Sequence, residues 1–153
     1  MQRSGANVEA IAARWIECAL ASYPAGTQAT ASVVRDPFRD PAGHTIRTSL
    51  TTLARELFGA MDEKAIAQAL DEVVRLRAVQ GFRPSEALGF LLELRQLAAA
   101  AADNRPADLD RRIDRLALMA FDLYMACRDR VAELREKELR VRLQYAAASR
   151  IEP

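Results

Sequence analysis

The chain has 153 residues, of which 50% are hydrophobic and 28% are charged, so one domain with a sizeable core is expected. Its 22 Lys and Arg residues nearly balance its 21 Asp and Glu residues, for a formal net charge of +1. This balance argues against nucleic-acid binding driven by a global positive field. One histidine and two cysteines do not supply a zinc site or a disulfide framework. We therefore expect no metal ion and no cofactor.

No segment has the composition of a signal peptide or a transmembrane helix. Glu9, Arg14 and Glu17 interrupt the hydrophobic residues near the N-terminus. No window approaches the roughly eighteen uncharged apolar residues that a membrane-spanning helix needs. Cys18 and Cys127 fall in amphipathic helical patterns, which favours two buried thiols over a redox-sensing pair. These features predict a cytoplasmic protein that makes no contact with a membrane.

Helical periodicity dominates the sequence, and the first helix is expected over residues 8–22. Asn7 is its expected N-cap, and Pro24 ends it. Residues 24–43 contain two Asp-Pro turn signals and are expected to form a long connection with a short extra helix or an ordered Ω-loop. His44 follows at the entry to the next helix. A role as an axial haem ligand is the alternative for this histidine.

Three helices come next, and each has a capping signal. They are expected over residues 45–60, 63–80 and 84–102. Asp62 can cap the middle one, and Gly81 follows its end as a terminating glycine would. Pro84 and Ser85 suit the first turn of the last of the three.

A fifth helix is expected over about residues 108–148, with Asp108 as its N-cap, because no Gly or Pro interrupts this stretch. Some forty helical residues measure about 60 Å, whereas a compact domain of this size is about 38 Å across. About residues 131–148 should therefore project. The sequence predicts a single all-α domain over residues 1–153, a five-helix bundle with a long, protruding C-terminal helix.

The two halves of this helix differ in composition. Between Ala117 and Cys127 the only charge is Asp122, which predicts a segment buried on all sides as the central helix of the bundle. Beyond Arg128 the sequence is rich in charge and keeps one apolar seam. The seam alternates steps of four and three residues and comprises Ile113, Ala117, Ala120, Tyr124, Cys127, Val131, Leu134, Glu138, Val141 and Tyr145.

Such a repeat predicts a coiled coil, and a homodimer is its simplest form. The expected dimer interface is the distal seam: Val131, Leu134, Glu138, Val141 and Tyr145. Glu138 weakens the packing and either sets the register or marks where the helices splay. The alternative is a solvated helix held by pairs such as Glu133–Lys137 and Glu138–Arg142. The alternating signs of charge argue against DNA binding by this segment.

Two charged residues interrupt the expected core. Arg77 shares the apolar face of the third helix, and Asp122 lies in the most apolar part of the fifth. Because a lone buried charge is costly, we expect the two to pair or to line one polar cavity. A structural ion pair and a ligand-sensing role both remain open. A catalytic carboxylate is disfavoured because the spacing places no second acid, histidine or nucleophile beside it.

Three blocks of sequence resemble a known family. They read DPFRDPAGHTI (36–46), RLRAVQGFRPSEALGFLLELR (75–95) and RIDRLALMAFDLYMACRDRVAELREKELRVR (112–142). Together they are similar to the N-terminal domain of RsbRD-type proteins, the RsbT co-antagonists of bacterial stressosome signalling. The likeness covers about residues 8–145.

The resemblance implies a non-enzymatic, all-α sensory or regulatory domain. In that family a STAS domain or a histidine kinase usually follows, and the long C-terminal helix hands the signal onward. No such domain follows within this sequence, so we expect a free-standing relative or an excised input domain, with a possible signalling partner in trans. The alternatives are a protein-interaction adaptor and a small-ligand-binding bundle.

The matched motifs contain seven candidate site residues. Five are candidates for a ligand site or a buried polar network: Arg77, Gln80, Asp122, Tyr124 and Arg128. Pro84 and Ser85 are expected to shape the turn between the third and fourth helices.

Overall fold

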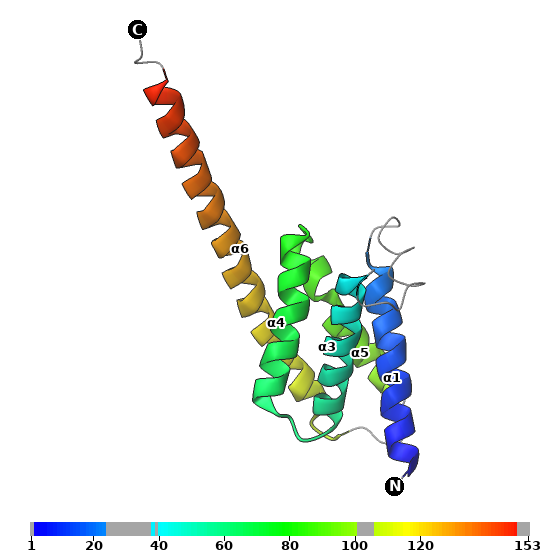
Figure 1. The fold of residues 1–153 in the computed structure, drawn as a ribbon. Coiled ribbons are helices and arrows are strands. Elements are labelled where there is room, and N and C mark those ends of the chain that lie inside the picture. Colours follow the sequence, from blue (N-terminus) through cyan, green and yellow to red (C-terminus); the bar gives the residue numbers. More distant parts are fainter. Residues whose placement is uncertain (1, 24–37, 39, 101–105, 150–153) are drawn as a thin grey trace.

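Five α-helices make up nearly all of the chain that the structure describes (Figure 1). The structure is a computed structural model, and it describes residues 2–23, 38, 40–100 and 106–149. The helices are α1 (Gln2–Ala21), α3 (Pro41–Phe58), α4 (Glu63–Val79), α5 (Pro84–Ala100) and α6 (Leu109–Ala148). No strand occurs in these ranges. The predicted all-α fold with a long C-terminal helix is confirmed.

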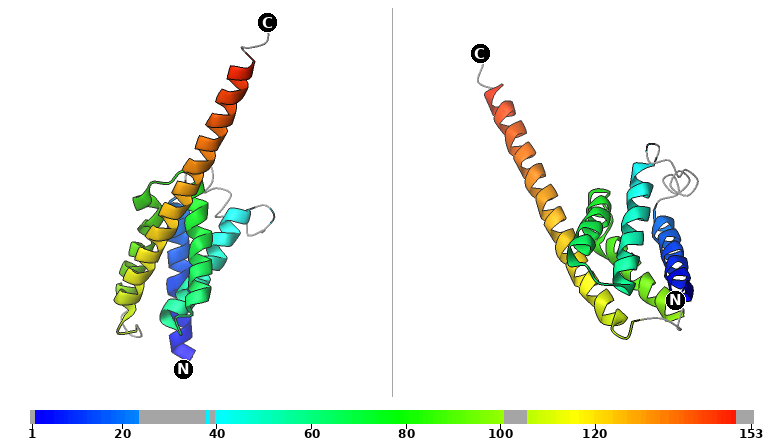
Figure 2. Two further views of the ribbon diagram at one scale, coloured as in Figure 1. Left: turned by 90° about the vertical axis from the view of Figure 1, so that its left-hand side faces the viewer. Right: turned by 60° about the horizontal axis from the view of Figure 1, so that its bottom comes forward.

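Four helices and the first half of α6 form the bundle, and the rest of α6 projects from it (Figures 1 and 2). α3 packs against α1 and α4, whereas α6 packs mainly against α4 and α5. The fully buried Trp15 of α1 lies against Phe90 of α5, with ring centroids 5.7 Å apart. The Trp15 indole N–H also donates to the Phe90 carbonyl oxygen. These contacts join α1 to α5 across the core.

Two helices begin earlier than the sequence predicted. α1 already includes residues 2–7, so Asn7 is not its N-cap. α3 begins at Pro41 because the Asp40 carboxylate accepts a hydrogen bond from the Gly43 N–H at 2.9 Å. The sequence predicts a turn at these two residues, but an Asp N-cap followed by Pro also begins a helix. The extra helix or Ω-loop expected before α3 falls mainly on 24–37, outside the described residues.

The caps around α4 are those predicted. The Asp62 carboxylate accepts from the Lys64 and Ala65 N–H groups at 2.9 and 3.2 Å. At the other end, Gly81 has a φ of 84°, the left-handed conformation that glycine adopts most easily. The turn that Gly81 closes brings the end of α4 next to the start of α5.

Replacing Asp62 with alanine should lower the free energy of unfolding by about 1 kcal/mol, because two N–H groups of the first turn lose their acceptor. Urea denaturation of the two proteins measures this difference. Asp62→Asn is the matched control, since asparagine is an equally good N-cap and should retain most of the stability. Equal losses in the two variants would show that charge rather than capping is responsible.

The prediction that α6 is buried on all sides between Ala117 and Cys127 is wrong. Leu118, Phe121 and Met125 are 70%, 49% and 41% exposed. α6 lies at the edge of the bundle and buries only the face that meets α4 and α5. The buried residues of α6 are Leu109, Ile113, Leu116, Ala120 and Tyr124.

Tyr124 is the last buried residue of α6, and none of residues 125–149 is buried. The helix nevertheless continues without a break to Ala148. The buried residues of α6 therefore end before its midpoint, seven residues before the projection expected from about residue 131, and the rest of the helix extends away from the bundle (Figure 1). The N-cap interaction expected of Asp108 is absent, and its carboxylate pairs with Arg112 at 3.0 Å instead.

Candidate functional site

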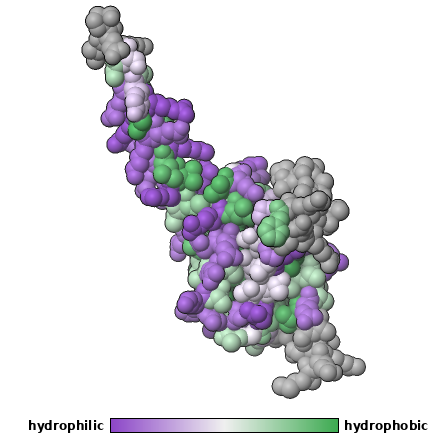
Figure 3. All heavy atoms as spheres, in the orientation of Figure 1, coloured by the Kyte–Doolittle hydropathy of each residue, from purple (hydrophilic) through white to green (hydrophobic). Residues whose placement is uncertain are grey.

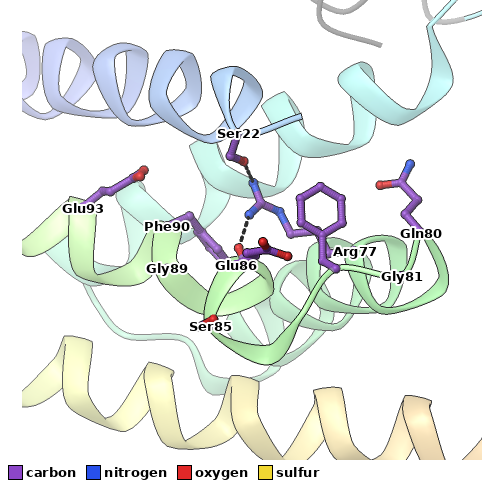
Figure 4. A pocket seen from close by; sticks show the side chains of 10 residues that line it. Ser22, Arg77, Gln80, Gly81, Ser85, Glu86, Gly89, Phe90 and Glu93 are labelled. Atoms are coloured by element: carbon purple, nitrogen blue, oxygen red, sulfur yellow. Dashed lines mark hydrogen bonds between the residues drawn. The ribbon is translucent and has the colours of Figure 1, made fainter. Parts of the chain in front are cut away.

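Arg77, in the last turn of α4, is completely buried and connects three helices. One terminal nitrogen, Nη2, donates to the Ala19 carbonyl at 2.9 Å and to the Ser22 hydroxyl at 3.1 Å. The other, Nη1, donates to the Glu86 carbonyl at 3.1 Å (Figure 4). The side chain thus ties the end of α1 to the first turn of α5, where backbone carbonyls of α1 lack intrahelical partners.

Three aromatic rings surround the guanidinium group. Its central carbon lies 5.2, 5.5 and 5.0 Å from the ring centres of Tyr23, Phe82 and Phe90. Cation–π attraction of this kind is strongest where water is excluded. Burial lowers the pKa of Arg77, and Tyr23 and Glu93 partly offset this effect. Burial also raises the pKa of Tyr23, so its hydroxyl stays protonated at neutral pH.

The predicted ion pair between Arg77 and Asp122 is wrong. Asp122 is exposed, and the hydrogen bonds of Arg77 go to two backbone carbonyls and a hydroxyl. The face of α6 that meets the bundle carries Ala120 and Tyr124, and Asp122 lies off that face. Asp122 is not part of the cavity beside Arg77 either.

A cavity of about 440 Å³ lies beside Arg77, between the end of α1, the end of α4 and the start of α5 (Figure 4). It is lined by Ser22, Arg77, Gln80, Gly81, Phe82, Ser85, Glu86, Gly89, Phe90 and Glu93. Of the predicted site residues, the structure therefore brings Arg77, Gln80 and Ser85 together. Arg128 is exposed on α6, and Pro84 occupies the first position of α5.

Tyr124 adjoins this cavity through one of its walls. Its buried hydroxyl donates a hydrogen bond to the Phe82 carbonyl oxygen at 2.7 Å. Phe82 in turn lines the cavity and faces Arg77. The hydrogen bond connects the cavity to α6 at the point where α6 leaves the bundle.

The predicted seam on α6 has two parts in the structure. Ile113, Ala120 and Tyr124 are buried against the bundle, whereas Leu134, Val141 and Tyr145 are 52%, 48% and 73% exposed. Val131 is half-buried, and Glu138 is exposed and pairs with Arg142 at 2.6 Å. Hydrophilic and apolar side chains alternate along the projecting segment (Figure 3). The seam is therefore a continuation, beyond the bundle, of the face that α6 buries within it.

Ion pairs also form along the projecting helix, as the alternative interpretation expects. Glu138–Arg142 is present, and Glu136 pairs with Arg140. Glu133 pairs with Arg130 rather than with Lys137.

Residues 9–139 match the protein family described as the RsbT co-antagonist protein rsbRD N-terminal domain. The chain belongs to this family. The resemblance found in the three sequence blocks is thereby confirmed. RsbRD N-terminal domains are regulatory and sensory domains rather than members of a known enzyme family.

One relative of this RsbRD N-terminal domain is an uncharacterized protein of Archaeoglobus fulgidus, which is 32% identical over 77 residues. The match covers 48% of this chain and 51% of that protein, so the chain spans about half the length of its relative. No solved structure matches the chain.

The remaining candidate groups of the RsbRD N-terminal domain lie apart from the cavity. His44 is exposed in the first turn of α3, as its helix-entry interpretation expects, and Cys18 and Cys127 are half-buried and free. In the described part of the chain, no three His, Cys, Asp or Glu side chains gather as they would around a metal ion. Among the described helices, none is both long and apolar enough to cross a bilayer.

Sequence reasoning missed Glu93 and Gly89 as cavity residues. Glu93 lies on a helix that is apolar on most sides, and its position at the cavity depends on the packing of α5 against α1. Gly89 did carry a signal, because a glycine inside a helix usually has a packing or functional reason.

Proposed function

We propose that this domain is a non-enzymatic regulatory domain that self-associates through α6 and relays a signal along it. The observation that carries the proposal is the continuity of one helix face. Within the bundle this face buries Ala120 and Tyr124, and beyond the bundle it exposes Leu134 and Val141.

An unbroken helix that belongs to both a packed core and an exposed seam couples the two. A small shift of α6 in the bundle displaces the seam, and pairing of the seam favours one position of α6 in the bundle. Two copies that pair along the seam would remove its apolar side chains from water. A regulatory assembly of the stressosome type, in the cytoplasm, is the setting that membership of the family favours.

Replacing Leu134 and Val141 together with serine should abolish self-association while leaving the bundle folded, because neither side chain contributes to the core. Light scattering during size exclusion gives the mass, and circular dichroism checks the helical content. The matched control replaces Leu139 and Leu143 with serine; both are exposed but lie off the seam. A monomeric parent protein at micromolar concentration, or equal behaviour of the two double variants, would contradict the proposal.

A second candidate function, an adaptor that binds a helix of another protein in trans, is favoured by the charges beside the seam. Arg128, Arg135 and Arg142 follow the seam residues on one side, and Arg130 and Lys137 precede them on the other. In coiled coils, residues at these flanking positions select the partner by charge. A partner helix with acidic flanks would meet opposite charges on both sides of the seam.

A further inference from the structure

A second apolar column runs along α6, on the side of the helix that is turned away from the bundle. Leu118 lies two residues from the buried Leu116 and two from the buried Ala120, and two residues correspond to about 200° around the helix axis. Leu118 therefore points away from the bundle, and the same position recurs every seven residues. The column, which we call the outer stripe, comprises Leu118, Met125, Ala132, Leu139 and Ala146, and all five side chains are exposed.

The outer stripe is separate from the seam. Met125 follows the seam residue Tyr124 by one position and precedes Cys127 by two. It therefore lies about 100° from the first and about 160° from the second around the helix axis. Pairing of the seam leaves the outer stripe uncovered. An apolar repeat of seven residues that continues over several heptads is typical of a helix face that packs on another helix.

Charges of opposite sign line the two sides of the outer stripe. Arg128 and Arg135 lie on one side, and Asp129 and Glu136 lie on the other. Arg128 and Asp129 have no opposite charge three or four residues away, so their own helix offers neither of them a partner. Within the described part of the chain, Arg128, Asp129 and Arg135 make no ion pair, although ion pairs form elsewhere on the projecting helix.

We propose that the outer stripe pairs in parallel with the outer stripe of a second copy, and so joins seam dimers into larger assemblies. In a parallel pair, the basic side of one stripe faces the acidic side of the other. Arg128 then meets Asp129 of the second copy, and Arg135 meets Glu136. In an antiparallel pair each side would face a side of its own sign, and like charges repel. The charges therefore select both the occupant, another α6, and its direction.

This step rests on the proposed function, because it acts on dimers that the seam has formed. The outer stripe offers one apolar position per heptad, and two of its five residues are alanine, whereas the seam offers two positions per heptad. The buried apolar area governs much of the strength of such pairing, so the outer stripe is the weaker surface. We expect dimers at micromolar concentration and larger species at submillimolar concentration.

Replacing Leu118 and Met125 together with serine should leave a dimer at submillimolar concentration, where the parent protein forms larger species. Both side chains are exposed, so the bundle should stay folded. Sedimentation velocity measures the mass, and circular dichroism checks the helical content. The matched control replaces Val79 and Leu92 with serine, which removes two exposed apolar side chains from α4 and α5. Loss of the larger species in the control as well would refute the assignment to the outer stripe.

Reversal of charge tests the direction of pairing. Arg128→Glu should weaken the association of dimers about tenfold, since two attractive pairs become two repulsive ones. Adding Asp129→Arg exchanges the two charges and should restore the association of the parent protein. Added salt should weaken this step in the parent, because its charge pairs attract. If the second change restored nothing, the parallel arrangement would be wrong.

The masses of these variants separate this proposal from the proposed function. A parent protein that remains a dimer at every concentration would refute pairing of the outer stripe and retain the seam. A monomer after replacement of Leu118 and Met125, together with a dimer after replacement of Leu134 and Val141, would retain pairing of the outer stripe and refute the seam. A parent protein that is monomeric at every concentration would refute both.

Discussion

Replacing Arg77 with alanine is expected to lower the free energy of unfolding by about 3–5 kcal/mol, as does breaking other buried polar networks. The side chain is entirely buried, and three of its hydrogen bonds connect α1, α4 and α5. Its removal leaves a cavity among three aromatic rings and leaves the Ala19 carbonyl with one donor fewer. Urea denaturation followed by circular dichroism measures the loss.

Asp122→Ala is the informative comparison for this variant. Because Asp122 is exposed, its replacement should change the free energy of unfolding by no more than about 0.5 kcal/mol. Arg77→Met should lower the free energy of unfolding by less than Arg77→Ala does. Methionine fills much of the space that the arginine side chain leaves, and it also removes the buried charge. If Asp122→Ala lowered the free energy of unfolding strongly in the parent protein but not in the Arg77→Ala variant, the two residues would be coupled. That result would contradict the separation of Arg77 from Asp122 in the structure.

Self-association through the seam is expected to strengthen as the salt concentration rises. In a parallel pair of α6 helices, Arg130 of one copy would lie beside Arg135 of the other, and Lys137 beside Arg142. These like charges repel, and salt screens exposed charges over about 10 Å at 0.1 M. Glu138, on the seam itself, would face its counterpart in the other copy and add to the repulsion. Sedimentation equilibrium over a series of salt concentrations measures the effect.

Arg135→Glu should tighten the dimer about tenfold at low salt, because two repulsive pairs become two attractive ones. Arg130 and Arg142 already pair with glutamates of their own helix, which makes Arg135 the suitable position. Arg111→Glu, an exposed change of equal charge at the other end of α6, is the control and should have little effect. Self-association through the seam that weakens as the salt concentration rises would contradict this arrangement of like charges.

Most of the architecture could be predicted from local chemistry. Asp62, Gly81 and Pro84 mark helix boundaries by mechanisms that act within a few residues, and the structure has the boundaries where they indicate. The projection of α6 follows from its length, which the absence of Gly and Pro fixes. At Asp40 and Pro41 the sequence predicts a turn where the structure begins a helix, because the same two residues can begin either.

The polar partners at the candidate site could not be predicted in the same way. Arg77 bonds to the carbonyls of Ala19 and Glu86, and a backbone carbonyl has no signature in the sequence. Asp122 was assigned to the core because its neighbours Phe121 and Met125 are apolar. Those two side chains are 49% and 41% exposed, and composition alone does not distinguish an outward-facing apolar residue from a buried one.

Because α6 leaves the bundle at Tyr124, a small tilt of the helix there moves its far end by a larger distance. From this last buried residue to Ala148 the helix extends for about 36 Å at 1.5 Å per residue. If α6 rotates about the point where it leaves the bundle, a tilt of about 5° at Tyr124 would displace the far end sideways by about 3 Å. A rearrangement too small to disturb the core would then be large enough to bring the distal parts of two seams into or out of contact.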